Sequence, residues 1–490
     1  LLASSGAILV CHSARLEDNA SDFQEVQIEG SRTVVNTIKG TVRGFIAHSS
    51  LGKPVRVFYG IPYAEPPIGE RRFGRAKSNQ PWAGVLDATV KPNSCVQRID
   101  KTYGNFSGSV KWNANTNLSE DCLKLNVWTP VPPCEEPAAV LVWIYGGGFF
   151  SGSSTLDFYD ARTLVSAEGV IVVSMNYRVA SLGFLSFGNK LLPGNAGLFD
   201  QSLALQWVRD NIAAFGGDPN RVTLFGESSG AFSVAVHLLS PLSTKLFMRA
   251  ILQSGSAIAP WGFQSRRKAR EAARRLAHAL GCPRSLDQKT LDCLRKKDPK
   301  EIVYSEKRIK GIVGPPYTPV ADGTFLSKSP KALIRERAFR KNIKIMLGSN
   351  LNEGSWFLQR FFGFSVKEEN PHVSKENFTT AVEVLDPYLG KPPTDAILGM
   401  YTGGKTPLRS KKKLAVLDLI VGDYHFTCPV VRLADNLVKA GVRVYEYVFA
   451  HRSSCNPWPR WMGVMHSEEV SFVFGEPFNA TFQYNREDKI

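Results

Sequence analysis

The pentapeptide Gly226-Glu227-Ser228-Ser229-Gly230 contains the residues of this chain best suited to nucleophilic chemistry. It lies between an apolar run at residues 222–225 and a stretch of helical character at residues 231–239. A strand, a tight turn and a helix form the context in which G-x-S-x-G becomes a nucleophile elbow. The flanking glycines carry no Cβ, so the chain can turn sharply and expose the serine hydroxyl. An ordinary Gly/Ser turn would have the same composition, so the rest of the chain must distinguish the two.

A glycine run, Gly146-Gly147-Gly148, follows a strand-like segment upstream of this pentapeptide. It is not a phosphate loop, because neither a lysine nor a spaced G-x-G-x-x-G pattern follows it. Unhindered backbone N–H groups can converge on the negative oxygen of a tetrahedral intermediate. The order of the two motifs therefore predicts an oxyanion hole rather than a flexible turn.

A hydrolase serine also needs an acid and a base, which follow it in the order Asp/Glu, then His. Glu353 follows a strand-like segment at residues 343–347. Of the eight histidines, His425, His451 and His466 lie well into the C-terminal part, and His466 occupies a loop between apolar segments. Spacing alone does not choose His466 over His451.

The segments around these motifs alternate between strands and helices. Residues 170–176 form a continuous apolar run typical of a strand buried on both faces, and residues 200–212 have helical character. Such alternation predicts an α/β fold with a large, mostly parallel central sheet flanked by helices. Because the sequence has no linker and no repeat, we expect one domain over residues 34–490.

The composition excludes several protein classes. The 490 residues are 43% apolar and 21% charged, which is typical of a globular chain with a large core. The net charge is +16, and much of the excess lies in residues 266–275, on an amphipathic helix that indicates a solvated outer face. No RNA- or DNA-binding signature accompanies this charge, so nucleic acid is not an expected partner.

Three features predict a secreted protein or one at the extracellular cell surface. Residues 1–14 have an apolar run and a small-residue cleavage site, as in the end of a signal peptide, with a buried strand as the alternative. Two close cysteine pairs, Cys95 with Cys122 and Cys282 with Cys293, would form disulfides suited to an oxidising compartment. Five sequons are candidate glycosylation sites: Asn19, Asn105, Asn117, Asn377 and Asn479.

Several ordered motifs together resemble the cholinesterase/type-B carboxylesterase family over nearly the whole chain, with the greatest similarity to its invertebrate-like acetylcholinesterases. The matching stretches are residues 60–69, 119–128, 143–149, 194–201, 215–219, 225–230 and 461–466. The resemblance implies the α/β-hydrolase fold. It also implies that Ser228 is the nucleophile, His466 the general base and then acid, and Glu353 the orienting carboxylate. The N–H groups of Gly147, Gly148 and Ser229 would form the oxyanion hole.

The same resemblance implies a site for a quaternary ammonium group. Trp112 lies inside the loop that Cys95 and Cys122 would close, and it matches a tryptophan that stacks on choline by cation–π attraction. Glu227 and Trp356 would complete this choline site. Four further residues match positions in or at the mouth of the active-site gorge: Asp100, Phe150, Trp458 and, as the peripheral tryptophan, Trp261.

The chain also departs from the family pattern. Ser229 stands where most cholinesterases have alanine, and only its backbone N–H is needed. Val313 and Pro315 replace acyl-pocket phenylalanines, which predicts a wider pocket for acyl groups larger than acetyl. Phe150, Arg98 and Arg360 replace gorge tyrosines, and the two cations would weaken steering of a cationic substrate.

The resulting expectation is a serine esterase that hydrolyses choline esters through an acyl-enzyme, with a small-molecule ester as its partner and without a metal or a cofactor. One alternative is a broad carboxylesterase without choline preference, and the other is a non-catalytic adhesion homologue. Cys428 matches a family cysteine whose partner lies beyond Ile490. We therefore expect a fragment, whose C-terminal tail would carry a membrane or matrix attachment and bear on formation of a homodimer.

Overall fold

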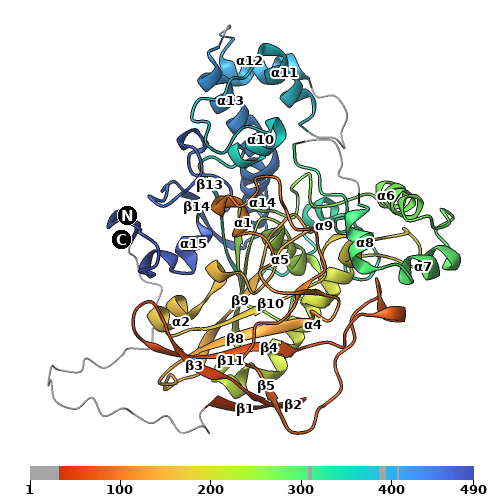
Figure 1. Ribbon diagram of the computed structural model, residues 1–490, viewed down its shortest axis with the longest axis vertical. Coiled ribbons are helices and arrows are strands. Elements are labelled where there is room, and N and C mark those ends of the chain that lie inside the picture. Colours follow the sequence, from red (N-terminus) through yellow and green to blue (C-terminus); the bar gives the residue numbers. More distant parts are fainter. Residues whose placement is uncertain (1–32, 307–311, 386–392, 405–407, 490) are drawn as a thin grey trace.

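The computed structural model describes residues 33–489, except 307–311, 386–392 and 405–407 (Figure 1). The expected signal remnant at residues 1–14 and the sequon at Asn19 lie outside the described residues. The expectation of one domain over residues 34–490 stays a prediction.

Nine strands form one central sheet in the order β14-β13-β12-β11-β9-β10-β8-β4-β3 (Figure 1). The six strands from β14 to β10 pair in parallel, whereas β8, β4 and β3 pair antiparallel. Helices lie around this sheet, so the predicted α/β fold class is confirmed. The strands are β3 (Phe45–His48), β4 (Pro54–Pro62), β8 (Lys124–Pro130), β9 (Ala138–Ile144), β10 (Ile171–Met175), β11 (Gly217–Glu227), β12 (Arg249–Gln253), β13 (Lys344–Asn350) and β14 (Arg443–Phe449).

The burial of the strands follows their composition. All five residues of β10 are buried, as the continuous apolar run predicts, because β10 is an inner strand of a sheet that has helices around it (Figure 1). At the edge of the sheet, β14 has no buried residue and alternates between exposed and partly exposed positions. Two small sheets lie outside the central one, formed by β1 (Val34–Thr37), β2 (Gly40–Arg43) and β5 (Val85–Asp87), and by β6 (Ser94–Cys95) and β7 (Leu118–Ser119).

The helices differ in how deeply they are buried. All eleven residues of α5 (Ser229–Leu239) are buried, because its sequence is apolar on every side. In contrast, α6 (Arg266–Ala279) buries only a stripe of alanine and leucine. The other α-helices are α1 (Ser107–Val110), α2 (Arg162–Glu168), α3 (Ala180–Phe184), α4 (Ala196–Asn211), α7 (Gln288–Arg295), α8 (Pro299–Tyr304), α9 (Pro330–Arg335), α10 (Ser355–Phe362), α11 (Lys375–Glu383), α12 (Thr394–Thr402), α13 (Ser410–Gly422), α14 (Cys428–Val438) and α15 (Val470–Val473).

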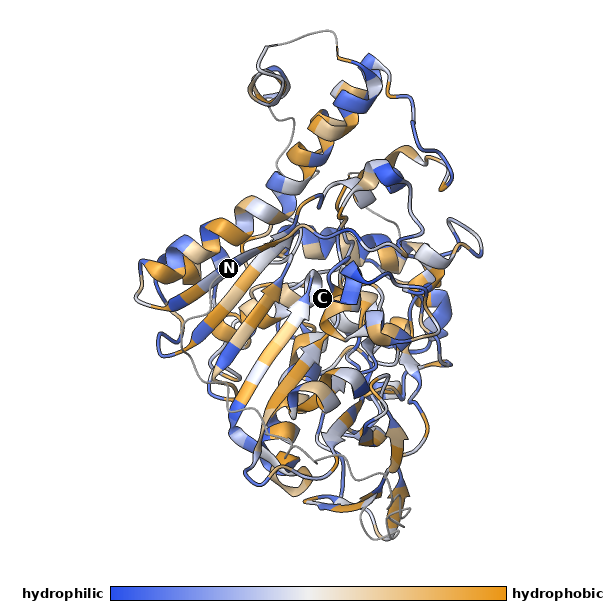
Figure 2. Cartoon of the chain, turned by 90° about the vertical axis from the view of Figure 1, so that its left-hand side faces the viewer, coloured by the Kyte–Doolittle hydropathy of each residue, from blue (hydrophilic) through white to orange (hydrophobic). Residues whose placement is uncertain are grey.

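One continuous helical stretch, Ser410–Val438, is long and apolar enough by length and composition to cross a membrane. It consists of α13, a π-helical turn at Asp423–Thr427 and α14, and Figure 2 shows apolar residues along much of its length. Of the 18 consecutive residues that are most apolar in this stretch, 61% are buried inside the protein. It contacts α10 at one end and β13 and β14 at the other, as a core helix of the fold does.

Candidate active site

Ser228 occupies the turn between β11 and α5, with a φ of 55° and a ψ of −119°. Such a conformation costs an L-residue about 1–3 kcal/mol and occurs mainly at functional turns. The glycines on either side are required by close approach to β9. A Cβ on Gly230 would lie 2.0 Å from the carbonyl oxygen of Ile144, and one on Gly226 would lie 2.6 Å from the same atom. The sharp turn expected from the pentapeptide is therefore present.

Glu353 and His466 lie in direct contact, although 112 residues separate them in the chain. The Oε2 atom of Glu353 lies 2.6 Å from Nδ1 of His466. Its Oε1 atom accepts hydrogen bonds from the Asn350 N–H at 2.8 Å and from the Ser254 hydroxyl at 2.5 Å. The carboxylate is thus held from both sides, in the position suited to orienting an imidazole.

The structure resolves the choice between the two histidines. His451 pairs with Asp488 at 2.8 Å, and its side chain is 40% exposed. His466 is buried against Glu353 and packs on the rings of Phe357 and Phe426. Of these two histidines, therefore, only His466 contacts Glu353.

The resemblance implies that the second ring nitrogen of His466, Nε2, faces the Ser228 hydroxyl. In the structure this atom does not hydrogen-bond to Ser228. Its Nε2 atom lies 3.1 Å from Oε1 of Glu227, and this oxygen also accepts the Ser467 hydroxyl at 2.5 Å. No hydrogen bond to the Ser228 hydroxyl is present within the described residues. A positively charged imidazolium gains more from a second carboxylate than from a neutral hydroxyl, which accounts for the difference.

This arrangement changes the proton affinity of His466. Burial by itself would lower its pKa, but the negative charges of Glu227 and Glu353 outweigh burial and raise the pKa to about 9. Burial raises the pKa of Glu227 as well, while the imidazolium beside it acts in the opposite direction. The two side chains therefore compete for one proton at the centre of the site.

A third buried carboxylate, Glu469, extends the network beyond the residues expected from the sequence. It accepts hydrogen bonds from Gln253 at 3.1 Å and from Asn350 at 2.6 Å. Burial and the nearby charge of Glu353 raise its pKa. The sequence contained a signal for it, because Ser467-Glu468-Glu469 follows His466 directly in an otherwise apolar segment.

A separate network joins the loop of the acid to the loop of the histidine. Asn352 precedes Glu353 in the chain. Its backbone N–H donates to the Val464 carbonyl at 2.9 Å, and its Oδ1 atom accepts from the Val464 N–H at 2.9 Å. Its amide donates to the buried carboxylate of Asp418 on α13 at 2.7 Å. A Cβ on Gly463 would lie 2.1 Å from the Asn352 Oδ1 atom, so this junction requires glycine.

The glycine run is folded back beside the elbow. Gly147 and Gly148 adopt φ values of 104° and 60°, and within the described residues neither N–H donates to a protein acceptor. The next N–H, that of Phe149, donates to the hydroxyl of Ser229 at 3.2 Å. The side chain of Ser229 therefore ties the glycine run to α5, whereas only its backbone N–H was expected to contribute.

A model of the carboxylesterase family matches residues 31–490. The chain belongs to the carboxylesterase family. This membership makes the protein an α/β-hydrolase and a serine-type carboxylic ester hydrolase, in agreement with the sharp turn at Ser228 and the buried pair of Glu353 and His466.

The disulfides predicted for this carboxylesterase, Cys95–Cys122 and Cys282–Cys293, are both formed. The loop closed by the first one carries Trp112, which is half-buried and packs edge-to-face on Phe158 with ring centroids 4.6 Å apart. Lys111 places its ammonium 5.5 Å from the centre of the Trp112 ring. One cation of the protein itself therefore already lies against the aromatic ring expected to bind choline.

Asp100 and Arg360 form an ion pair. Although burial acts to raise the pKa of Asp100, hydrogen bonds from Thr102 and Arg360 outweigh it and lower the pKa to about 2. The Arg360 guanidinium also lies 5.7 Å from the ring centre of Trp356. The acidic residue expected to attract cations at the gorge mouth is thus neutralised by an arginine that also contacts a second aromatic residue of the expected choline site.

Two of the tryptophans matched to gorge and peripheral positions are buried. Trp261 is 3% exposed and its indole N–H donates to the His425 carbonyl at 3.0 Å, and its assignment as the peripheral tryptophan stays a prediction. Trp458 is also 3% exposed, and Tyr103 and Phe106 cover it at ring distances of 5.5 and 4.7 Å. Both side chains contribute to apolar packing, and the assignment of Trp458 to a gorge also stays a prediction.

The remaining expected positions are occupied as follows. Phe150 is half-buried beside Gly148, and Val313 and Pro315 are buried next to residues 307–311, which lie outside the described part of the chain. A wider acyl pocket therefore stays a prediction.

Among the sequons, Asn105, Asn117 and Asn377 are exposed and Asn479 is half-exposed, so glycosylation at these sites stays a prediction.

Proposed function

We propose that this carboxylesterase cleaves its ester through an acyl-enzyme on Ser228. The observation that supports this step is the contact of Glu353 with His466 next to the strained turn at Ser228. His466 takes the proton of the Ser228 hydroxyl as the serine attacks the acyl carbon, and it then protonates the leaving alkoxide. Water activated by the same imidazole releases the acid. During these steps Nε2 of His466 must face Ser228 in place of Glu227, while Glu353 keeps its hold on Nδ1.

The free N–H groups of Gly147 and Gly148, together with that of Ser229 at the start of α5, are proposed to stabilise the negative oxygen of the intermediate. Removing one such donor typically lowers kcat by about 10²–10³-fold. The hydrogen bond from Phe149 to Ser229 would hold this run in place between turnovers.

For the substrate, we favour esters with uncharged leaving groups. The supporting observation is that cations of the protein already lie beside both expected aromatic contacts, Lys111 at Trp112 and Arg360 at Trp356. Arg360 also neutralises Asp100. With a net charge of +16, the chain gives a cationic ester little electrostatic attraction at long range.

Choline esters are the second candidate, in line with the resemblance to acetylcholinesterases. The observation in their favour is that Trp112 is only half-buried and that Glu227, a buried carboxylate, lies beside the nucleophile. An indole face and a nearby carboxylate are what a quaternary ammonium group requires. We also propose that the protein is secreted, forms a homodimer and attaches to a membrane or to the matrix.

The two substrate classes are separated by comparing acetylthiocholine with its uncharged isostere, 3,3-dimethylbutyl thioacetate. We expect kcat/KM for the neutral ester to equal or exceed that for acetylthiocholine, and Arg360→Ala to raise only the value for acetylthiocholine. A preference of wild type for acetylthiocholine above tenfold would instead establish the choline ester. Ser228→Ala is the control for both substrates, and full activity of this variant would exclude Ser228 as the nucleophile.

A third possibility, a non-catalytic adhesion protein, is tested by the same chemistry. Folded protein should react with an organophosphate in a 1:1 ratio at Ser228, as identified by mass spectrometry of the labelled peptide. Absence of labelling, with the fold intact by circular dichroism, would favour adhesion.

A further inference from the structure

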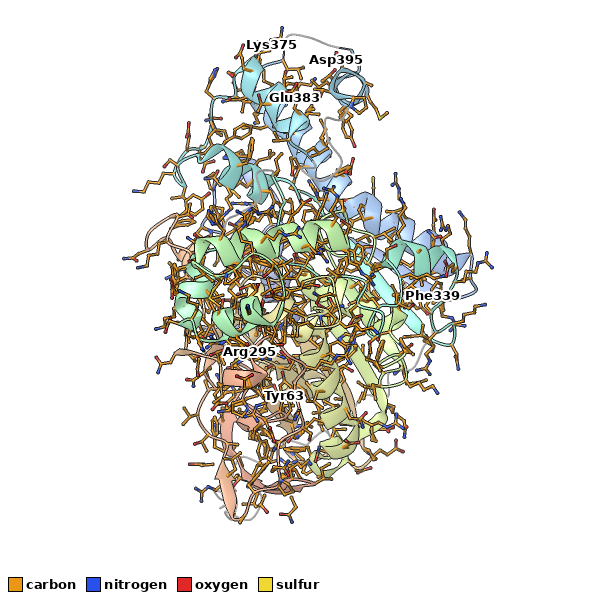
Figure 3. The ribbon with its side chains drawn as sticks, turned by 90° about the vertical axis from the view of Figure 1, so that its right-hand side faces the viewer. Tyr63, Arg295, Phe339, Lys375, Glu383 and Asp395 are labelled. Atoms are coloured by element: carbon orange, nitrogen blue, oxygen red, sulfur yellow. A yellow bond between two sulfur atoms is a disulfide. The ribbon has the colours of Figure 1, made fainter. Side chains whose placement is uncertain are left out.

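The face of α6 that points away from the core carries an unusual concentration of positive charge. Residues 265–286 contain seven arginines and lysines but a single acidic residue, Glu271. This helix lies on the right-hand side in Figure 1, and that side faces the viewer in Figure 3. None of its residues is among those assigned to the esterase reaction.

Three of these arginines form a row along the helix. Arg266, Arg270 and Arg274 follow one another at intervals of four residues, so they share one face and span about 12 Å at 1.5 Å per residue. Their like charges at this spacing destabilise an isolated helix by a few tenths of a kcal/mol per pair. The sequence therefore keeps a charge pattern that does not help the helix to form.

Within the described part of the chain, the row has no acidic partner. Glu271 pairs with Arg267 at 2.8 Å, and among the described residues none forms an ion pair with Arg266, Arg270 or Arg274. Their stems are nevertheless positioned. A Cβ on Gly188 would lie 3.0 Å from the Arg270 Cγ atom and 3.4 Å from that of Arg266, so both stems lie close over this glycine. The exposed Lys190 follows two residues later and adds charge beside the row.

We propose that Arg266, Arg270 and Arg274, with Lys190, form a binding surface for a sulfated polysaccharide, which we name the α6 arginine row. A guanidinium offers a rigid fork of donors that matches an oxyanion with two parallel hydrogen bonds. A linear chain of sulfate groups can pair with successive arginines of the row. Such polymers occur outside cells, where we expect this protein to act.

The other polyanions fit this surface less well. Membrane-surface helices insert an apolar face into the lipid, but the apolar face of α6, with Ala269, Ala273 and Leu276, is buried in the protein. Proteins that bind single-stranded nucleic acid stack bases on aromatic side chains, and α6 contains none. The surface therefore favours discrete anionic groups on a carbohydrate chain.

The proposal is tested by measuring the affinity of the full chain for immobilised heparin as a function of NaCl concentration. The variant Arg266→Gln/Arg270→Gln/Arg274→Gln is compared with Arg209→Gln/Arg432→Gln/Arg486→Gln, which removes the same charge from exposed positions on other elements. We expect Kd near 0.1 M salt to rise about tenfold or more in the first variant and less than twofold in the second. The slope of log Kd against log salt should fall by about two to three in the first variant only.

Equal losses in the two variants would overturn the proposal, because the attraction would then come from net charge alone. Loss of binding to phosphatidylserine vesicles with heparin binding unchanged would also overturn it, in favour of a membrane surface. Esterase activity of both variants should match wild type, since the row lies outside the catalytic machinery. If the triple variant does not fold, heparin must protect Arg266, Arg270 and Arg274 of wild type from phenylglyoxal, as read by peptide mass spectrometry, and failure to protect them contradicts the proposal.

Discussion

At the scale of single residues, the site is a set of buried carboxylates arranged around one imidazole. Glu353 holds Nδ1 of His466 at 2.6 Å, and Glu227 lies 3.1 Å from Nε2. Two negative charges within hydrogen-bonding distance favour the imidazolium form. A general base must be neutral to accept a proton, so this arrangement sets the pH at which catalysis begins.

Replacing Glu227 by Gln should therefore shift the pH profile of kcat/KM. In wild type the pKa of His466 is raised to about 9, so His466 is protonated at lower pH and activity should increase toward pH 9. Removing the charge of Glu227 lowers the pKa of His466, and the acidic limb should move to lower pH by about one unit or more. The measurement is kcat/KM for a neutral ester between pH 5 and 10. An unshifted limb would show that Glu227 does not interact with the free-enzyme histidine.

At the scale of secondary-structure elements, three neighbouring parallel strands position the reacting groups. Ser228 follows β11, Ser254, which donates a hydrogen bond to Glu353, follows β12, and Glu353 lies just beyond β13, all at the carboxyl ends of the strands. The histidine comes from a long loop after β14 that has no strand of its own. This loop is tied down by Asn352, which joins Val464 to Asp418 on α13.

Asn352→Ala tests this tie between elements. It removes the acceptor of the Val464 N–H and a donor to the buried Asp418, and an unsatisfied buried polar group costs about 1–3 kcal/mol. We expect the free energy of unfolding in urea to fall by this amount and kcat to fall by more than KM rises, because His466 loses its position. The control is Asn436→Ala, whose exposed amide bonds only within α14. Equal kcat in Asn352→Ala and wild type would contradict the positioning role.

At the scale of the whole molecule, the two disulfides whose cysteines both lie in the described residues close loops with different tasks. The Cys95–Cys122 loop carries Asp100 and Trp112, whereas the Cys282–Cys293 loop lies at α7. The separations of 27 and 11 residues make the first loop the larger constraint on the unfolded chain. If Asp100 and Trp112 contact the ester as proposed, the first disulfide connects global stability to substrate binding, and the second does not.

Removing each disulfide by a double Cys→Ala change should separate these effects. Chain entropy predicts losses of unfolding free energy of about 3.5 kcal/mol for Cys95–Cys122 and about 2.8 kcal/mol for Cys282–Cys293. Only the first change should also raise KM, because Trp112 and Asp100 would lose their positions. Unfolding in urea and steady-state kinetics on the same samples provide both numbers. An equal rise of KM in the two variants would show that the 95–122 loop has no particular role in binding the ester.

The sequence by itself determined the features that depend on neighbouring residues. The pentapeptide around Ser228 required a sharp turn because of its two glycines, the apolar run at residues 170–176 predicted a buried strand, and the close cysteine pairs predicted both disulfides. These properties are local, so the chain encodes them within a few residues or a short loop.

Only the tertiary structure decided which distant side chains share a proton or a charge. His466 rather than His451 meets Glu353, Glu227 competes with Ser228 for the imidazole, and Arg360 neutralises Asp100 across 260 residues. Tertiary packing likewise places Trp261 in the apolar core, where its indole N–H donates to the His425 carbonyl. Electrostatic energies depend on distances of a few ångströms and on exclusion of water, and the folded chain sets both quantities, whatever the spacing in the sequence.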